Sequence, residues 1–175
     1  MKFRALFLSL FLSVASFAQT GNYFLSHFSP GQKQADNVCF DIVQDKRGVF
    51  YFATQAGVLQ FDGRNWDIIR TNGAVYAIEL TETGEIYVGG SKGFGKITLN
   101  ENGLESFVPI YDQADAEYVF QIVSIQESIY FLNDKSLFTY SVTTDSVSAR
   151  SSGETIGALS NLSEISGSLY ISTEE

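Results

Sequence analysis

The run from Gly89 to Lys96 is the part of the chain whose spacing most resembles a site for chemistry. Gly90, Gly95 and Lys96 have the spacing of a phosphate-binding loop, but Ile97 stands where a serine or threonine would bind magnesium. The run also leads into an apolar strand pattern, whereas phosphate cradles use the N-terminus of a helix. We therefore interpret it as a glycine-rich hairpin, and we predict no nucleotide or other cofactor.

A thiol nucleophile would need a histidine partner, and the chain holds one cysteine and one histidine, Cys39 and His27. His27 lies in a polar N-terminal stretch. The neighbours of Cys39 are Val38 and Phe40, which favour a small buried hydrophobe over a nucleophile. A single cysteine also allows no intramolecular disulfide. We predict that this segment has no catalytic residue and is not an enzyme.

An acidic loop carries Asp112, Asp115 and Glu117, whose oxygens could bind calcium. Their spacing does not match the twelve-residue calcium loop. The sequence therefore favours a solvated connection with room for one helical turn, and it predicts no metal site.

Four other short patterns have structural interpretations. Trp66 is expected to pack on an outer strand, with stacking on a sugar ring as the alternative. The pairs Asp62-Gly63 and Asn102-Gly103 are typical of hairpin turns. Residues 161–163 match the glycosylation pattern, a short match of low specificity. No ligand-binding residue follows from these patterns.

The first residues predict export. Lys2 and Arg4 precede an apolar run of about 13 residues, which is shorter than the roughly 20 that a membrane-spanning helix needs. Small residues follow, so residues 1–18 are predicted to be a signal peptide cut after Ala18, and residues 19–36 an N-terminal extension. The formal net charge of the chain is −9, and no basic stripe is visible. This excludes nucleic acid as an expected partner of the segment.

The remaining chain repeats one pattern: an apolar strand, a polar turn, and an aromatic-rich strand with a tyrosine at a fixed place. The equivalent tyrosines are Tyr51, Tyr87, Tyr130 and Tyr170, separated by 36, 43 and 40 residues. A period near forty is typical of propeller blades. The sequence therefore predicts an all-β chain with almost no helix.

Each copy has the strand and turn signals of a four-stranded antiparallel blade. The predicted propeller spans 37–175, with blades at about 37–72, 73–112 and 117–152 and an incomplete one at 156–175. Three and a half blades cannot close a ring, so we expect the chain to be a fragment of a propeller of seven or more blades. The alternative is an open half propeller, or one completed by another chain. Neighbouring blades must cover each other's apolar faces.

The first copy carries a family resemblance. Its Asn37–Gly63 segment resembles the two-component-regulator propeller repeat in the order of strand, aspartate turn, aromatic strand and aromatic-Asp-Gly ending. The matching positions are Ile42, Asp45, Gly48, Tyr51, Thr54, Gly57, Leu59, Phe61, Asp62 and Gly63. The second copy departs at Gly90, which replaces the threonine, and the third at Glu127, which replaces the turn glycine.

The resemblance implies a periplasmic sensor region attached to the inner membrane through a C-terminal part beyond this segment. Such proteins continue into an immunoglobulin-like domain, a membrane helix and a kinase, phosphatase or LuxR-type DNA-binding output. Their partners are extracellular or periplasmic ligands, among them glycans, and the full-length proteins can be homodimers. Two alternatives remain open: an exported propeller enzyme acting on polysaccharide, and a secreted structural or adhesion propeller.

Overall fold

The computed structural model describes residues 26–30, 38–152 and 158–174. The predicted signal peptide and most of the N-terminal extension lie outside these ranges. In them, no helix has the length and hydropathy needed to cross a membrane.

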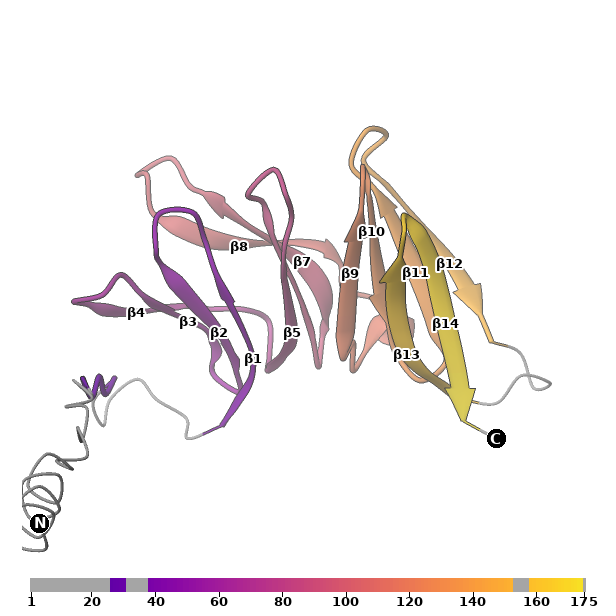
Figure 1. The fold of residues 1–175 in the computed structure, drawn as a ribbon, viewed down its shortest axis with the longest axis horizontal. Coiled ribbons are helices and arrows are strands. Elements are labelled where there is room, and N and C mark those ends of the chain that lie inside the picture. The colour runs from indigo at the N-terminus through magenta and orange to yellow at the C-terminus, as the bar shows by residue number, and fades with distance from the viewer. Residues whose placement is uncertain (1–25, 31–37, 153–157, 175) are drawn as a thin grey trace, which may run out of the picture.

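The described chain is all-β, as predicted, and forms three four-stranded antiparallel sheets and one two-stranded sheet (Figure 1). The first sheet contains β1 (Cys39–Gln44), β2 (Phe50–Thr54), β3 (Gly57–Phe61) and β4 (Trp66–Ile69). The second contains β5 (Val75–Leu80), β6 (Ile86–Gly90), β7 (Gly93–Leu99) and β8 (Glu105–Tyr111). The third contains β9 (Gln121–Ile125), β10 (Ser128–Leu132), β11 (Ser136–Ser141) and β12 (Ser146–Ser151). The fourth contains β13 (Ala158–Ile165) and β14 (Ser168–Glu174).

Each sheet is a meander in which consecutive strands are neighbours. Glycine stands where the turns need a positive φ: Gly48, Gly63 and Gly84 have φ values of +85°, +91° and +94°, a region that glycine enters without steric cost. In the third sheet, which lacks the turn glycine, Gln126 adopts φ +53° in its place. The only helical element of the described ranges is the 3-10 turn Ala114–Ala116, which confirms the single turn expected in the acidic loop.

Strand register confirms the alignment of the repeats. Tyr51 pairs with Gln60 across β2 and β3, Tyr87 with Lys96 across β6 and β7, and Tyr130 with Thr139 across β10 and β11. Each tyrosine stands three residues before the close of its hairpin. The three side chains therefore occupy one structural position in successive sheets.

Successive sheets bury these tyrosines against one another. Tyr51 lies in a core cluster shared by the first and second sheets, and Tyr87 in one shared by the second and third; both are fully buried. Tyr130 is half-buried against the two strands of the fourth sheet, and Tyr170 on that sheet is 54% exposed. Burial of each tyrosine thus depends on the sheet that follows it.

On the opposite face of each sheet, the burial of side chains depends on the sheet that precedes it. Ile78, Ile122 and Leu162 are buried against the preceding sheet, whereas Ile42 at the same position of the first sheet is 50% exposed. The first sheet presents an aromatic group on this face, where Phe61 stacks on Trp66 with ring centroids 4.3 Å apart. The described sheets do not close into a ring.

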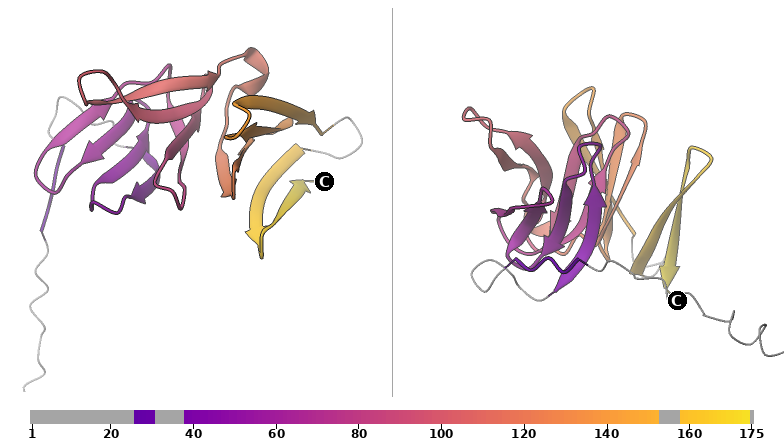
Figure 2. Two further views of the ribbon diagram at one scale, coloured as in Figure 1. Left: turned by 90° about the horizontal axis from the view of Figure 1, so that it is seen from above. Right: turned by 60° about the vertical axis from the view of Figure 1, so that its left-hand side comes forward.

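The first strand of every sheet lies beside the first strand of the next, as the views in Figure 2 show. Polar side chains join them: Ile78 N donates to Asp41 Oδ2 (3.0 Å), Ser124 N donates to Glu79 Oε1 (3.1 Å), and Leu162 N donates to Gln121 Oε1 (2.7 Å). These bonds satisfy backbone donors at the inner edge of the sheets, where no neighbouring strand of the same sheet could do so.

One burial prediction is wrong. Cys39 is exposed, because it opens β1 on the face of the first sheet that no other described sheet covers. Its Sγ donates to the carbonyl of Asp41 at 3.2 Å. Partial burial of the thiol raises the pKa of Cys39 above its ordinary value, which is unfavourable for a nucleophile.

Candidate functional site

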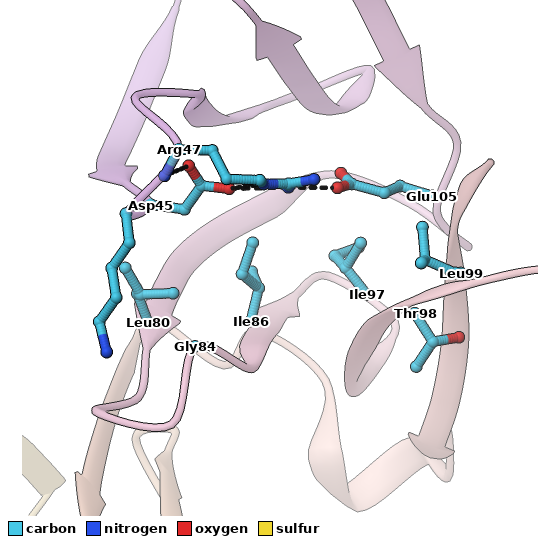
Figure 3. Close-up of a pocket in the computed structure, with 10 residues that line it drawn as sticks. Asp45, Arg47, Leu80, Gly84, Ile86, Ile97, Thr98, Leu99 and Glu105 are labelled. Atoms are coloured by element: carbon cyan, nitrogen blue, oxygen red, sulfur yellow. Dashed lines mark hydrogen bonds and ion pairs between the residues drawn. The ribbon is translucent and has the colours of Figure 1, made fainter. Parts of the chain in front are cut away.

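A pocket of about 330 Å³ opens between the turn that joins β1 to β2 and the second sheet (Figure 3). The first sheet contributes one charged wall, and the second contributes the rest. The lining residues are Asp45, Lys46, Arg47, Leu80, Gly84, Ile86, Ile97, Thr98, Leu99 and Glu105. This volume lies at the lower end of the range for small-molecule sites. We call it the rim pocket.

The charged wall begins with a turn that fixes Asp45. Its Oδ1 accepts hydrogen bonds from the backbone N–H groups of Arg47 (2.8 Å) and Val49 (3.0 Å), as aspartate commonly does in turns. Arg47 Nε then donates to Asp45 Oδ2 at 2.7 Å. The guanidinium is thereby held over the second sheet, where Nη2 donates to Glu105 Oε1 at 2.7 Å.

Tyr51 completes this network from the core side. Its hydroxyl accepts a bond from Arg47 Nη2 (2.7 Å) and donates one to Glu105 Oε1 (2.9 Å). Burial, followed by the hydrogen bond to Glu105, raises the pKa of Tyr51 above its ordinary value, so the hydroxyl stays protonated. Tyr87, at the same position one repeat later, has a buried hydroxyl without a partner among the described residues. The network therefore belongs to the first junction, by which we mean the contact between the first and second sheets; the second junction is the contact between the second and third.

The floor of the rim pocket is aliphatic. In Figure 3 the side chains of Leu80, Ile86 and Ile97 stand below the Asp45–Arg47–Glu105 row and point toward it, with Leu99 beside them. Leu99, the last residue of β7, is 66% exposed. A charged row over an aliphatic floor suits a small ligand that has one polar end and one apolar body.

Removing the Tyr51 hydroxyl tests the network. Tyr51→Phe is expected to lower the free energy of unfolding by about 1.5–3 kcal/mol, because two hydrogen bonds to charged groups are lost and Glu105 loses a donor. Tyr130→Phe is the matched control, since its hydroxyl makes no hydrogen bond within residues 38–152 and is not fully buried. Urea unfolding of both variants measures the difference; equal effects would contradict the network's contribution.

The Asp45 carboxylate gives the junction an acid dependence. Burial raises the pKa of Asp45, but the hydrogen bonds from the Arg47 side chain and from the Val49 and Arg47 N–H groups outweigh it, so the pKa is lowered overall. A lowered carboxyl pKa stabilises the fold above the ordinary aspartate pKa, and this stability is lost as pH falls through the folded-state value. The stability gap between wild type and Asp45→Asn should therefore shrink on acidification from about pH 6 to about pH 2. Chemical unfolding across that range measures it, with Asp67→Asn as control; a constant gap would refute the assignment.

A second cavity of about 460 Å³ lies at the same end of the sheets as the rim pocket, farther along the chain. It is lined by the equivalent hairpins of the second, third and fourth sheets, and it carries Glu82, Glu127 and Glu164. Thr143 donates to Glu127, and Gly167 N donates to Glu164 at 2.5 Å. In the described ranges, no three His, Cys, Asp or Glu side chains lie close enough together to hold a metal ion.

An aromatic row lies at the start of the first strands. Phe40 and Tyr76 are the extra residues of β-bulges in β1 and β5, and their rings meet edge to face with centroids 5.0 Å apart. Tyr76 lies nearly parallel to Tyr118 at 6.4 Å. Tyr118 is 61% exposed and has φ +60°, a conformation uncommon for aromatic residues. Bulges often re-aim side chains near binding sites.

The glycine-rich run is a hairpin, as predicted. It joins β6 to β7, and Gly90 and Gly93 pair at the turn. Lys96 lies within β7, in a strand and not at the N-terminus of a helix.

The other sequence candidates are also located. Asp115 accepts a bond from the Tyr111 hydroxyl (3.2 Å), and Glu117 pairs with Lys92 (2.9 Å), so these two acidic side chains have protein partners. Trp66 is half-buried on Phe61, which agrees with packing on an outer strand. Asp62-Gly63 and Asn102-Gly103 form the expected turns. Asn161 is exposed on β13, and His27 is exposed.

Sequence reasoning missed the residues of the rim pocket and of the aromatic row. Arg47 was visible two residues after a turn aspartate, a spacing that allows the contact observed. Glu105 carried no signal, because it lies 58 residues from Arg47 and only the packing of two sheets brings them together.

No protein-family model matches the chain, and a search of curated proteins finds no matching relative.

Proposed function

We propose that the chain is the ligand-sensing propeller region of an exported signalling protein, located in the periplasm and attached to the inner membrane by a part beyond residue 175. The observation that carries this proposal is the rim pocket, whose charged wall joins Asp45 and Arg47 of the first sheet to Glu105 of the second, and whose floor comes from the second sheet. A ligand there would contact both sheets. Its binding would therefore change how strongly the two sheets are held together.

The four sheets are proposed to be successive blades of one propeller. Support comes from the repeated junction, in which a tyrosine on one sheet is covered by an isoleucine or leucine face on the next. Tyr170 and Ile42 are the two positions at which this pairing is incomplete. Further blades between these two faces would complete a ring and leave no exposed sheet face.

Signal transfer would use the same contacts. Arg47 reaches Glu105 across the first junction, and Lys46 Nζ donates to the carbonyl of Glu82 at 2.9 Å on the neighbouring hairpin. A ligand that competes for these groups would shift one blade relative to the next. We propose that the segment binds and transmits, and that it catalyses no reaction.

Two measurements test the proposal. Alkaline phosphatase fused after Glu175 should be active in cells when residues 1–18 are present and inactive when they are deleted. The reading frame downstream of Glu175 should encode further repeats, a membrane helix and an output domain. A cytoplasmic fusion protein would overturn export, and a downstream sorting domain without a membrane helix would favour the adhesion alternative.

The enzyme alternative is a propeller acting on polysaccharide. The second cavity favours it most, since three glutamates surround it. Hydrolysis or cleavage of polysaccharide by the exported protein, abolished by Glu127→Gln, would establish that alternative.

A further inference from the structure

The charge around the rim pocket points to the class of ligand, an inference that rests on the proposal that this pocket is the sensing site. Asp45 and Glu105 have side chains that are only 9% and 13% exposed, so water screens them weakly. Both are bonded to the one guanidinium of Arg47. Two weakly screened carboxylates thus share one cation at the wall of the pocket.

Glu105 is incompletely neutralised by this arrangement. Its Oε1 accepts from both Arg47 and Tyr51, whereas its Oε2 is buried and has no hydrogen-bond partner within the described part of the chain. The hydrogen bonds that Arg47 donates to Glu105 and then to Asp45 raise the pKa of Arg47 above its ordinary value, as expected where carboxylates surround a cation. The wall therefore favours positive charge.

The surrounding turns add to this bias. Lys46 is the other cation of the lining, but its Nζ is bonded to the Glu82 carbonyl of the next hairpin. Neither cation of the lining is therefore free to pair with an anionic ligand, because Arg47 is bonded to Asp45 and Glu105, and Lys46 to the Glu82 carbonyl.

The aliphatic floor indicates what the apolar part of the ligand is. Leu80, Ile86, Ile97 and Leu99 present only aliphatic carbon, and the volume of about 330 Å³ admits a single small molecule. An extended alkyl chain buries apolar area on such a floor, and this burial favours binding.

We propose that the rim pocket binds a small organic cation with an aliphatic body, an alkylammonium group above all. Its ammonium lies at the Asp45–Glu105 side, and its chain lies on the aliphatic floor. The cation adds to Arg47 as a second positive partner of the two carboxylates.

Three probes of equal length test the charge preference: n-pentylammonium, n-pentanol and pentanoate, titrated into the purified chain at pH 7. We expect n-pentylammonium to bind about tenfold more tightly than n-pentanol, and pentanoate more weakly than either. Amide chemical shifts of Arg47 and Glu105 report the location. Tighter binding of pentanol or pentanoate at these amides would overturn the ligand class and leave the pocket as a binding site. If none of the three probes bound, both the ligand class and the assignment of the rim pocket as the sensing site would be overturned.

Variants separate charge from contact area. Glu105→Gln should weaken n-pentylammonium about tenfold and leave n-pentanol unchanged. Glu101→Gln, in the exposed turn before β8, is the matched control and should change neither. Leu99→Ala removes an exposed side chain without threatening the fold, and it should weaken both probes alike. The proposal would be overturned if n-pentylammonium bound a folded Glu105→Gln protein as tightly as it binds wild type. It would also be overturned if n-pentylammonium bound Leu99→Ala as tightly as it binds wild type.

Discussion

Replacing Phe131 by alanine should lower the free energy of unfolding by about 3–5 kcal/mol, the range for truncation of a fully buried phenylalanine. Phe131 on β10 is fully buried and stacks on Phe94 of the second sheet with centroids 3.9 Å apart. Its ring also meets Tyr87 edge to face at 6.3 Å. The substitution opens a cavity between two sheets, so both sheets lose contacts.

The matched control is Phe120→Ala. Phe120 precedes β9 and is 39% exposed, so its loss should cost about 1 kcal/mol. Guanidinium unfolding monitored by circular dichroism measures both variants. If Phe131→Ala were no more destabilising than the control, the second junction could not be the packed interface described.

Gly90→Ala should destabilise the protein by about 3 kcal/mol or prevent folding, because overpacking against backbone cannot be relieved by a rotamer change. A Cβ at Gly90 would lie 1.9 Å from the carbonyl oxygen of Ala74 and 2.9 Å from Val75 Cα. The glycine is therefore explained by close backbone approach at a hairpin, and no phosphate is needed to account for it.

Gly63→Ala is the control for this glycine. Gly63 has φ +91° but open space around it, so alanine there should cost about 1–2 kcal/mol from backbone conformation alone. Thermal unfolding of the two variants should rank Gly90→Ala as clearly worse. The reverse order would contradict the steric account of the glycine-rich run.

The repeat could be predicted from sequence because its signals are local. The spacing of Tyr51, Tyr87 and Tyr130 reflects one register position, and the turn glycines mark the ends of hairpins. The alternation of burial within β2, where Tyr51 and Ala53 are buried and Phe50 and Phe52 half-buried, follows from side chains that point to opposite faces. These features depend on neighbours close in the chain, so one copy predicts the next.

The site could not be predicted in the same way, because it depends on contacts between sheets. Tyr51 and Tyr87 occupy equivalent positions of the repeat, yet only Tyr51 of the two joins a charged network. The reason is that Arg47 and Glu105 contact Tyr51, and this pair is not repeated beside Tyr87. Cys39 was expected to be buried because its neighbours in sequence, Val38 and Phe40, are apolar. The first sheet has no described neighbour on that side, so its first strand is exposed.

The proposed architecture depends most on direct packing between neighbouring repeats, and a double-mutant cycle on Phe94 and Phe131 tests this packing. Each residue is replaced by leucine singly and together, and the free energies of unfolding are compared. The stacked pair predicts a coupling energy of about 0.5–1.5 kcal/mol. Effects that add to within about 0.3 kcal/mol would contradict contact between the second and third sheets.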